Sequence, residues 1–398
     1  DAMPLIYNAS DQPIQKAASD ALYDFSVLRD IILEPGTERK VSARTIQGFT
    51  RYILSVYQEH NYAGIYVYVP AEAMAEAGQL KDGILQIQVL EAPVTEVSVK
   101  MYDPDQNPKK TGYLKQSFIE DWSPIKVGQV ANQKELDDYV NLLNLNPDRY
   151  VSAVVTKGSA PQSLAVAYDV YEANPWHFFV QADNSGTRDR KWSPRVGIIN
   201  TNLLGIDDTF TAIYQAPWEK GIEDEYSVFG SYDFPLVGPR LRLNIYGGYS
   251  QFDTTPAGGG IDFFGSGSFV GGILRWNVYQ TGGWFFDLKG LLNYERSKTT
   301  PSLFPSFLGS DVRVAMIGWG AEVHRSDDLS NTRLSWDVSE SFETSDQASF
   351  SLARTGAPIN FRIYNTSAEH SQFLDPNKVH RITGTFRWID SSDRLIPA

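Results

Sequence analysis

Residue types that commonly carry out chemistry are scarce and widely spaced in this sequence. Its 398 residues include no cysteine, which excludes disulfides, thiolate catalysis and cysteine-ligated zinc. No set of Ser, His and acidic residues suggests a hydrolase. The five histidines show neither the HExxH spacing nor another recognised metal spacing; they are His60, His177, His324, His370 and His380. The sequence therefore predicts no catalytic residue, no metal site and no cofactor.

Two short segments start like ligand-binding loops but lack residues that such loops need. Segment 103–107 (DPDQN) starts like a calcium loop, but Pro108 replaces the glycine at its sixth position and Leu114 the acid at its twelfth. Segment 265–268 (GSGS) is glycine-rich, but neither a lysine nor a helix signal follows it. We interpret the first segment as a polar turn and the second as a loop or the start of a strand.

The composition limits the kind of protein and the partners that we expect. A formal net charge of −13 argues against general affinity for nucleic acid or anionic lipid. No stretch approaches the roughly 20 apolar residues of a membrane helix. The chain opens with residues 1–4 (DAMP), without the basic segment and apolar core of a signal peptide. We expect a mature exported protein.

From Trp176 to Trp388 the chain alternates apolar and polar residues, in segments separated by turns rich in Gly, Pro, Asn and Asp. Segments 241–246 (LRLNIY), 284–289 (WFFDLK) and 382–388 (ITGTFRW) show the pattern. Successive side chains of a strand point to opposite faces, so each segment has one apolar and one polar face. A soluble sandwich would bury the apolar face against a second sheet, whereas a membrane barrel turns it towards lipid around a wet lumen. We favour the barrel.

The turns support this choice, because short turns at one rim and long loops at the other are typical of outer-membrane barrels. Segments 281–283 and 375–377 are short turns, whereas 256–265, 300–309 and 344–360 are long loops. We expect about eleven antiparallel strands. They span residues 176–184, 193–201, 208–217, 224–235, 239–252, 267–279, 284–297, 311–325, 331–343, 361–373 and 379–391.

The same alternation assigns side chains to faces, because a register of period two fixes which residues share a face. On the strand at 239–252 the expected lipid-facing residues are Leu241, Leu243, Ile245 and Tyr249. The expected lumen-facing residues on this and later strands are Arg242, Asn244, Ser250, Asp287, Lys289 and Arg387. Inward charges of this kind fit the lining of a lumen better than a barrel-resident hydrolase site.

Before the alternating region, a unit of about 75 residues occurs twice. In the first copy we expect a strand at 24–33, a helix capped by Ser42, and strands at 64–69 and 83–90. In the second copy we expect a strand at 94–101, helices at 113–119 and 136–143, and strands at 150–155 and 163–171. The predicted organisation is a tail at 1–22, two domains at 23–92 and 93–173, and the alternating region at 174–398.

Motifs in these regions resemble those of the outer-membrane transporters of bacterial two-partner secretion, the haemolysin and filamentous-haemagglutinin type. Segment 143–153 (LNLNPDRYVSA) is similar to the family's LN-x-x-P-x-R-x-V-x-A run. Segments 183–187 (DNSGT) and 203–208 (LLGIDD) are similar to its DN-x-G strand end and its L-x-G-x-x-D turn. The first repeat fits more loosely, since Tyr62 follows an Asn where the family has Gly-Tyr. The order of the motifs carries the resemblance.

The resemblance implies a fold of α+β repeats followed by all-β structure: two POTRA domains of the β-α-α-β-β type before a sixteen-stranded transmembrane barrel. The family's Arg-Gly-Tyr/Phe tripeptide, on a loop after the eleventh strand, does not occur here. We therefore expect an incomplete barrel of about eleven of the sixteen strands, with the rest beyond Ala398.

The resemblance also implies a function, passive export of a large partner exoprotein across the outer membrane of a diderm bacterium. We expect a monomer with residues 1–173 in the periplasm, whose partners are the exoprotein and membrane lipid but not nucleic acid. An extended secretion signal would add to open sheet edges of the two repeats. The residues expected at these edges are Ile65, Tyr66, Val67, Tyr68 and Val69, and Val151, Ala153 and Val155.

Two alternatives remain. One is a barrel-assembly factor of the same superfamily, which more than two repeats would favour. The other is a barrel-anchored enzyme or a porin with small periplasmic domains, which a convergent Ser/His/Asp set or constitutive conductance would favour.

Overall fold

The computed structural model describes residues 3–10, 12–74, 79–184, 191–219, 225–254, 263–301 and 309–395. The chain divides into two compact units, and the second repeat contributes to both. One unit holds Asp1–Lys100, Ser123–Val140 and Val151–Asp169, and the other holds Met101–Trp122, Asn141–Tyr150 and Val170–Ala398. Among the described helices, none has both the length and the apolar character needed to cross a membrane.

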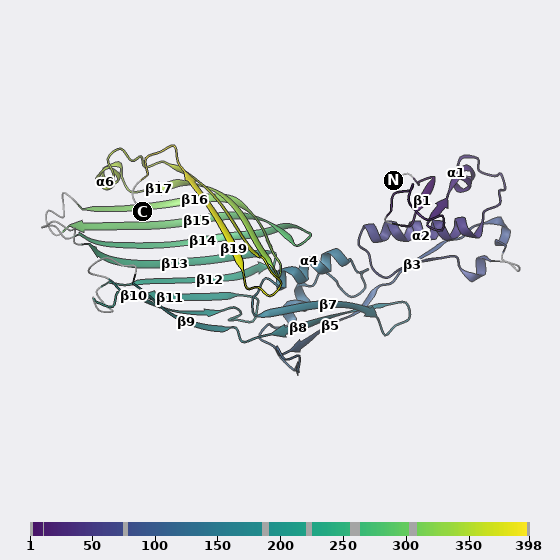
Figure 1. The fold of residues 1–398 in the computed structure, drawn as a ribbon, viewed down its shortest axis with the longest axis horizontal. Coiled ribbons are helices and arrows are strands. Elements are labelled where there is room, and N and C mark those ends of the chain that lie inside the picture. Colours follow the sequence, from purple (N-terminus) through teal and green to yellow (C-terminus); the bar gives the residue numbers. More distant parts are fainter. Residues whose placement is uncertain are drawn as a thin grey trace. The chain divides into compact units, whose positions relative to one another are not determined.

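The first repeat is a small α/β domain (Figure 1). Its elements are β1 (Ile6–Asn8), β2 (Leu22–Asp24), α1 (Ser26–Leu33), α2 (Ala43–Glu59), β3 (Ile65–Tyr68), the 3₁₀ turns η1 (Ala71–Ala73) and η3 (Lys81–Gly83), and β4 (Gln88–Glu91). Tyr23, Phe25 and Leu28 form a buried cluster against which Tyr52 of α2 packs. Gly48 lets helix α2 come close to this cluster, since a Cβ at that position would lie only 2.4 Å from the Tyr23 ring.

The predictions for this domain are confirmed in part. The strand expected at 64–69 is β3, whereas only the end of the one expected at 83–90 lies in β4. Segment 24–33 is mainly the helix α1 rather than a strand, because a short apolar run does not distinguish the two periodicities. The stretch 1–22 is not merely a tail, since β1 pairs with β2 in antiparallel register. Ser42 is the N-cap of α2, as predicted, and its hydroxyl accepts a hydrogen bond from the Thr45 amide at 3.0 Å.

The second repeat contains a four-stranded sheet in the order β6-β5-β8-β7. Its elements are β5 (Val94–Tyr102), β6 (Pro108–Lys109), α3 (Gln116–Trp122), α4 (Gln133–Leu143), β7 (Arg149–Lys157) and β8 (Leu164–Glu172). Every second residue of β8 is buried, which gives the sheet one core face. On that face the Tyr168 hydroxyl lies 2.7 Å from the Ser123 hydroxyl, and burial raises the pKa of Tyr168 to about 12.

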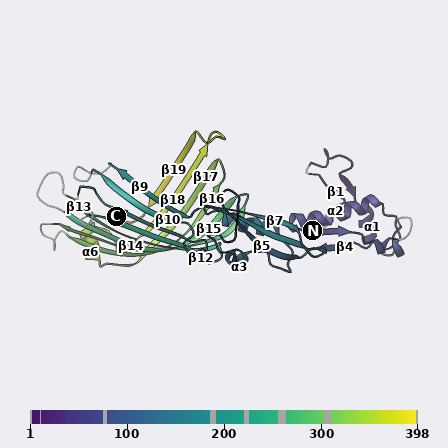
Figure 2. The same cartoon turned by 90° about the horizontal axis from the view of Figure 1, so that it is seen from below.

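The alternating region folds into one antiparallel sheet of eleven strands that follow one another in sequence order, and the strands lie side by side in a curved layer (Figures 1 and 2). The strands are β9 (Trp176–Asp183), β10 (Ser193–Asn200), β11 (Thr209–Gln215), β12 (Ser227–Val237), β13 (Leu241–Thr254), β14 (Phe263–Thr281), β15 (Trp284–Pro301), β16 (Ser310–Ser326), β17 (Ser330–Thr344), β18 (Arg362–Phe373) and β19 (Arg381–Asp390). Helix α6 (Gln347–Ala353) lies between β17 and β18.

This sheet confirms the predicted strand number and antiparallel order. Strands β9 and β19 each have one neighbouring strand, and the described residues contain no pairing between them. The sheet is therefore open, as predicted.

The short turn at 281–283 places Gly282 and Gly283 at φ values of 54° and 78°, the left-handed pair that a two-residue hairpin requires. Segment 344–360 contains α6 and is not a plain loop. Residues 185–187 of the DN-x-G segment and the loop tips at 255–262 and 302–308 lie outside the described residues.

Candidate functional site

The predicted capture strands are both edge strands within the described sheets. Strand β7 has only β8 beside it, and β3 has only β4. Ala153 and Val155 lie within β7 and are partly exposed. Val151 also lies in β7, but its side chain is buried in the domain core. The two strands therefore offer main-chain edges rather than a side-chain pocket.

The residues predicted on β3 differ in how far their side chains are exposed. Ile65 is buried, Val67 is half-buried, and Tyr66 and Tyr68 are 52% and 37% exposed. Val69 lies just after the end of the strand, so the prediction that it belongs to the strand edge is wrong. The exposed tyrosines alternate with the inward residues, as period two requires.

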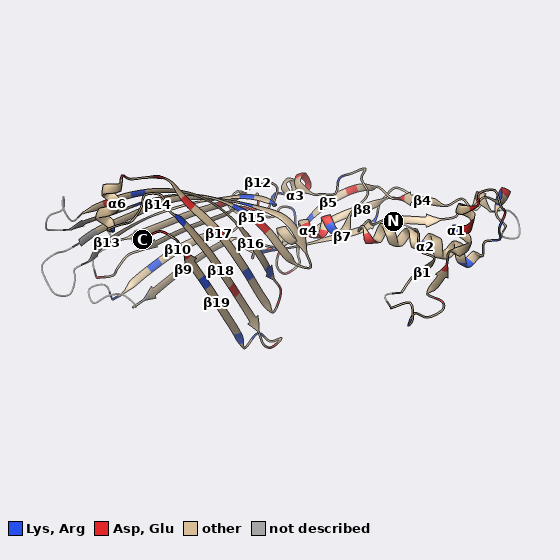
Figure 3. Cartoon of the chain, turned by 90° about the horizontal axis from the view of Figure 1, so that it is seen from above, with Lys and Arg blue, Asp and Glu red and all other residues tan. Residues whose placement is uncertain are grey.

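The eleven-stranded sheet has one apolar and one polar face, set by cross-strand register. Leu241 lies opposite Trp276, which lies opposite Leu288. This mainly apolar row, in which Trp276 and Leu288 are exposed, continues through Ala321, Trp336, Thr366 and Trp388. On the other face Arg242 lies opposite Arg275, which lies opposite Lys289. That row continues through Gly320, Asp337 and Asn365. Charged residues are a minority along these strands in Figure 3. On the polar face Arg242 forms ion pairs with Asp207 and Asp233, and Lys289 forms one with Asp337.

The six residues predicted to line a lumen share the polar face, and Ser250 is eight positions from Arg242 on β13. Arg242 and Asn244 are two positions apart on β13, and Asp287 and Lys289 are two positions apart on β15. Arg387 lies opposite Ser367, which lies opposite Ser335 on the same face. The hydroxyl of Ser335 accepts a hydrogen bond from Lys289 at 2.6 Å. That this face borders a lumen stays a prediction.

One buried ion network joins the start of β7 to this polar face. The Arg149 side chain is 1% exposed and forms an ion pair with Asp207, in the turn between β10 and β11. Asp207 also accepts a hydrogen bond at 2.7 Å from Arg242, whose Nε donates to Asp233 at 2.7 Å. The two motif segments 143–153 and 203–208, recognised separately in the sequence, are therefore in direct contact.

Further buried polar contacts hold the same region. Glu172, the last residue of β8, accepts hydrogen bonds from the amides of Tyr113 at 2.7 Å and Leu114 at 3.0 Å. Burial raises the pKa of Glu172, although the two amides act in the opposite direction. Asp148, beside Arg149, accepts a hydrogen bond at 2.7 Å from the Thr201 hydroxyl. The Glu172 contacts hold the second repeat together, and the Asp148–Thr201 bond joins it to the sheet that begins at β9.

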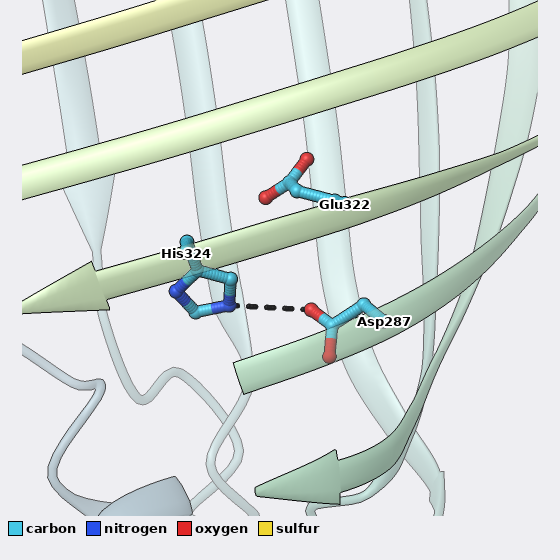
Figure 4. Close-up of side chains that lie close together, drawn as sticks. All are labelled: Asp287, Glu322 and His324. Carbon is cyan, nitrogen blue, oxygen red and sulfur yellow. Dashed lines mark hydrogen bonds and ion pairs between the residues drawn. The ribbon is translucent and has the colours of Figure 1, made fainter. Parts of the chain in front are cut away.

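A second polar cluster lies on β14, β15 and β16, and its members Asn277, Asp287 and His324 line a cavity of about 360 Å³. Asp287 lies opposite Glu322 in the register of β15 and β16. His324 is two residues further along β16, and its Nε2 lies 3.3 Å from Asp287 Oδ2 (Figure 4). Asn277 of β14 donates to the other oxygen of Asp287 at 2.7 Å. Ligand-type atoms of Asp287, Glu322 and His324 all lie within 4.8 Å of one another.

Helix α6 covers another part of the polar face. Phe350 is fully buried against Val312 and Val314 of β16 and against Phe361. Val312 and Val314 are an even number of residues from Glu322 and so share its face. Asp346 caps the helix by accepting a hydrogen bond from the Ser349 amide at 2.8 Å, and this bond lowers the pKa of Asp346.

Most of these partners were not predicted from the sequence. Alternation predicts the face of Arg242, Asp287 and Lys289, but it does not indicate Asp207 or His324, whose partners lie far away in the chain. The available signal was the spacing of Glu322 and His324, which puts both on one face of a strand.

Comparison with models of known protein families finds no match, and comparison with curated protein sequences finds none either. Solved structures do match. CdiB from Escherichia coli aligns over 99% of this chain and 70% of its own, with 14% identity and a TM-score of 0.68. CdiB from Acinetobacter baumannii aligns over 100% of this chain and 70% of its own, with 14% identity and a TM-score of 0.65. The chain has the CdiB fold. The predicted fold class, POTRA repeats followed by an antiparallel sheet of barrel type, is therefore confirmed.

Proposed function

We propose that this protein exports a large partner protein across an outer membrane, as a two-partner secretion transporter. The observation that carries the proposal is the CdiB fold over the whole chain, found in a sequence whose motifs resemble that family. CdiB is such a transporter. At this identity the likeness establishes the fold, and the activity is our inference from it.

Capture of the partner is assigned to the repeats. Strands β3 and β7 present sheet edges to which an extended segment can add by main-chain hydrogen bonds. The exposed Tyr66 and Tyr68 would flank a segment added to β3. In this proposal residues 1–173 lie in the periplasm and the protein acts as a monomer.

Passage is assigned to the barrel region. The apolar row of Leu241, Trp276 and Leu288 suits lipid, and the opposite polar face suits a wet path. Transport of an unfolded chain along such a path requires no catalytic residue. We therefore propose that the protein is not an enzyme and needs neither a cofactor nor nucleic acid.

A comparison of cell fractions tests the proposal. Cells with and without the natural protein are compared by mass spectrometry of the culture medium, the periplasm and the outer membrane. We expect one or a few large proteins to be absent from the medium when the transporter is lost, while the amounts of the outer-membrane proteins stay constant. Unchanged medium together with depleted outer-membrane proteins would instead support the assembly factor. No change in any fraction would favour the porin or enzyme.

A further inference from the structure

We propose that Asp287, Glu322 and His324 form a binding site for a divalent transition-metal ion, with Zn²⁺ the best match, on the polar face of β15 and β16. This inference does not depend on the proposed export function, because metal binding is measured without transport.

The register of two strands builds the site. Glu322 and His324 are two residues apart on β16, so their side chains project from one face. Asp287 on β15 lies directly opposite Glu322 and projects to the same side (Figure 4). The Nε2 atom of His324 and Oδ2 of Asp287 are 3.3 Å apart. A tetrahedral ion with ligand bonds of about 2.1 Å separates its ligand atoms by about 3.4 Å, so these two atoms already have the required spacing.

The electrostatics of Glu322 point to a cation. Two carboxylates directly opposite one another on neighbouring strands repel, and both Asp287 and Glu322 are more than nine-tenths buried. Within the described residues, Oε1 of Glu322 has no hydrogen bond. Two cations lie near Glu322 without tight contact: Arg333 Nε is 3.3 Å from Oε1, and Lys289 Nζ is 3.6 Å from Oε2.

A metal ion could displace both of these cations from Glu322. Lys289 has closer partners in Asp337 at 2.7 Å and Ser335 at 2.6 Å. The side chain of Arg333 is 55% exposed and can turn outwards. An ion placed between Asp287, Glu322 and His324 would relieve the carboxylate repulsion more directly than Arg333 and Lys289 near Glu322 and Arg275 near Asp287 do.

Neighbouring residues hold the ligands in place, as second-shell groups do in metal sites. Asn277 donates to Oδ1 of Asp287 at 2.7 Å and so leaves Oδ2 towards the site. Asn277 itself accepts a hydrogen bond at 2.9 Å from Gln280. The His324 imidazole stacks on Phe285, with ring centroids 4.8 Å apart and planes inclined by 4°.

The donor set selects the class of ion. One imidazole and two carboxylates are ligands that Zn²⁺ accepts, with water in the fourth position. Calcium prefers six to eight oxygen ligands, and magnesium keeps an octahedral, mostly hydrated shell. Three protein ligands that include a nitrogen do not satisfy either ion.

The experiment uses the full chain, purified in detergent without a polyhistidine tag and stripped of metals with a chelator. Zn²⁺ is titrated by calorimetry, and Co²⁺ is added to the same protein to record its visible absorption. We expect about one Zn²⁺ per chain, and Co²⁺ bands typical of a low-coordinate site with a nitrogen ligand. Calcium and magnesium should not compete at similar concentrations.

Three variants locate the ion. His324→Gln removes the nitrogen ligand and should weaken Zn²⁺ binding by at least about 100-fold, while the second-shell variant Asn277→Ala should weaken it by about 10-fold to 100-fold. His370→Gln is the matched control, because His370 lies on β18 beside Thr332 and outside the cluster. It should bind Zn²⁺ as the wild type does.

Two results would overturn the proposal. One is a wild-type chain that gives only the spectrum of hydrated Co²⁺ and no saturable Zn²⁺ binding. The other is a folded His324→Gln variant, judged by circular dichroism, that binds Zn²⁺ with unchanged affinity. If His324→Gln does not fold, the wild-type Co²⁺ spectrum alone decides.

Discussion

Replacement of Asp207 by Asn is the sharpest test of the ion network that joins β7 to the eleven-stranded sheet. Asp207 has a φ of 66°, and Asn tolerates this left-handed region better than most residues. Asp207→Asn therefore removes the charge with little change of shape or backbone strain. The variant leaves Arg242 paired with Asp233, but it deprives the buried Arg149 of its carboxylate.

The expected magnitude follows from burial. Removal of one partner from a buried ion pair costs about 3–5 kcal/mol, because the remaining charge is uncompensated. Arg149 keeps its hydrogen bonds to the Leu143 carbonyl at 3.1 and 2.7 Å, and the Asn amide oxygen can still accept one. We therefore expect a loss near the lower limit, about 3 kcal/mol in the free energy of local opening.

Hydrogen exchange of the full chain in detergent measures this change where it occurs. An opening free energy lowered by about 3 kcal/mol should speed amide exchange in β7 and in the turn at 201–208 roughly 150-fold. Glu340→Gln is the matched control, because its pair with Arg362 has both side chains 52% exposed. Loss of such an exposed pair should change exchange by less than about fivefold, equivalent to about 1 kcal/mol or less.

A double-mutant cycle provides the result that would refute the reasoning. Arg149→Met in the Asp207→Asn background removes the uncompensated charge, so the double variant should be at least about 1.5 kcal/mol more stable than the sum of the single effects predicts. If the effects simply add, or if Asp207→Asn and Glu340→Gln speed exchange equally, the buried pair does not stabilise this region as argued.

Three further predictions concern the two faces, the sheet edges and pH. Leu243→Arg should impair membrane insertion by roughly 2–4 kcal/mol while Asn244→Arg does not, measured by folding into lipid vesicles, and the reverse order would place lipid on the other face. Val67→Pro or Ala153→Pro should weaken binding of a secretion-signal peptide and secretion itself, because proline donates no main-chain hydrogen bond; unchanged binding by both folded variants would remove capture from these edges. Burial raises the pKa of Glu172 above its ordinary 4.5, so its stabilising contribution is full at low pH and declines as pH rises through the folded value. The wild type should therefore lose stability relative to Glu172→Gln as the pH rises above about 4.5, measured by urea unfolding, and parallel pH profiles would contradict this.

The features that the sequence predicted are those that depend on local patterns. Helix α2 was predicted because Ser42 is a good N-cap and the apolar residues after it recur at helical spacing. Segment 24–33 was mispredicted because α1 lacks such a signal: its N-cap Phe25 makes no side-chain capping bond. Ile32 and Leu33 at its end are 68% and 69% exposed, so the apolar run does not mark the buried face.

The α6 segment shows a second limit. The sequence at 344–360 offered no strand alternation and was predicted to be a loop. Helix α6 is only seven residues long, and short helices are marginal without tertiary packing. Its stability comes from the burial of Phe350 against Val312 and Val314, a contact that no local pattern contains.

The polar clusters mark the limit of alternation itself. Period two determines which face of a strand a residue occupies, and it correctly put Arg242, Asp287 and Lys289 on one face. It does not determine which residue of the next strand lies opposite, because that depends on the register set by each connecting turn. A shift of two residues between β15 and β16 would keep every face unchanged and yet move Glu322 away from Asp287. The polar face of the sheet could therefore be predicted from the chain, whereas the proposed metal site across two strands required the register observed in the structure.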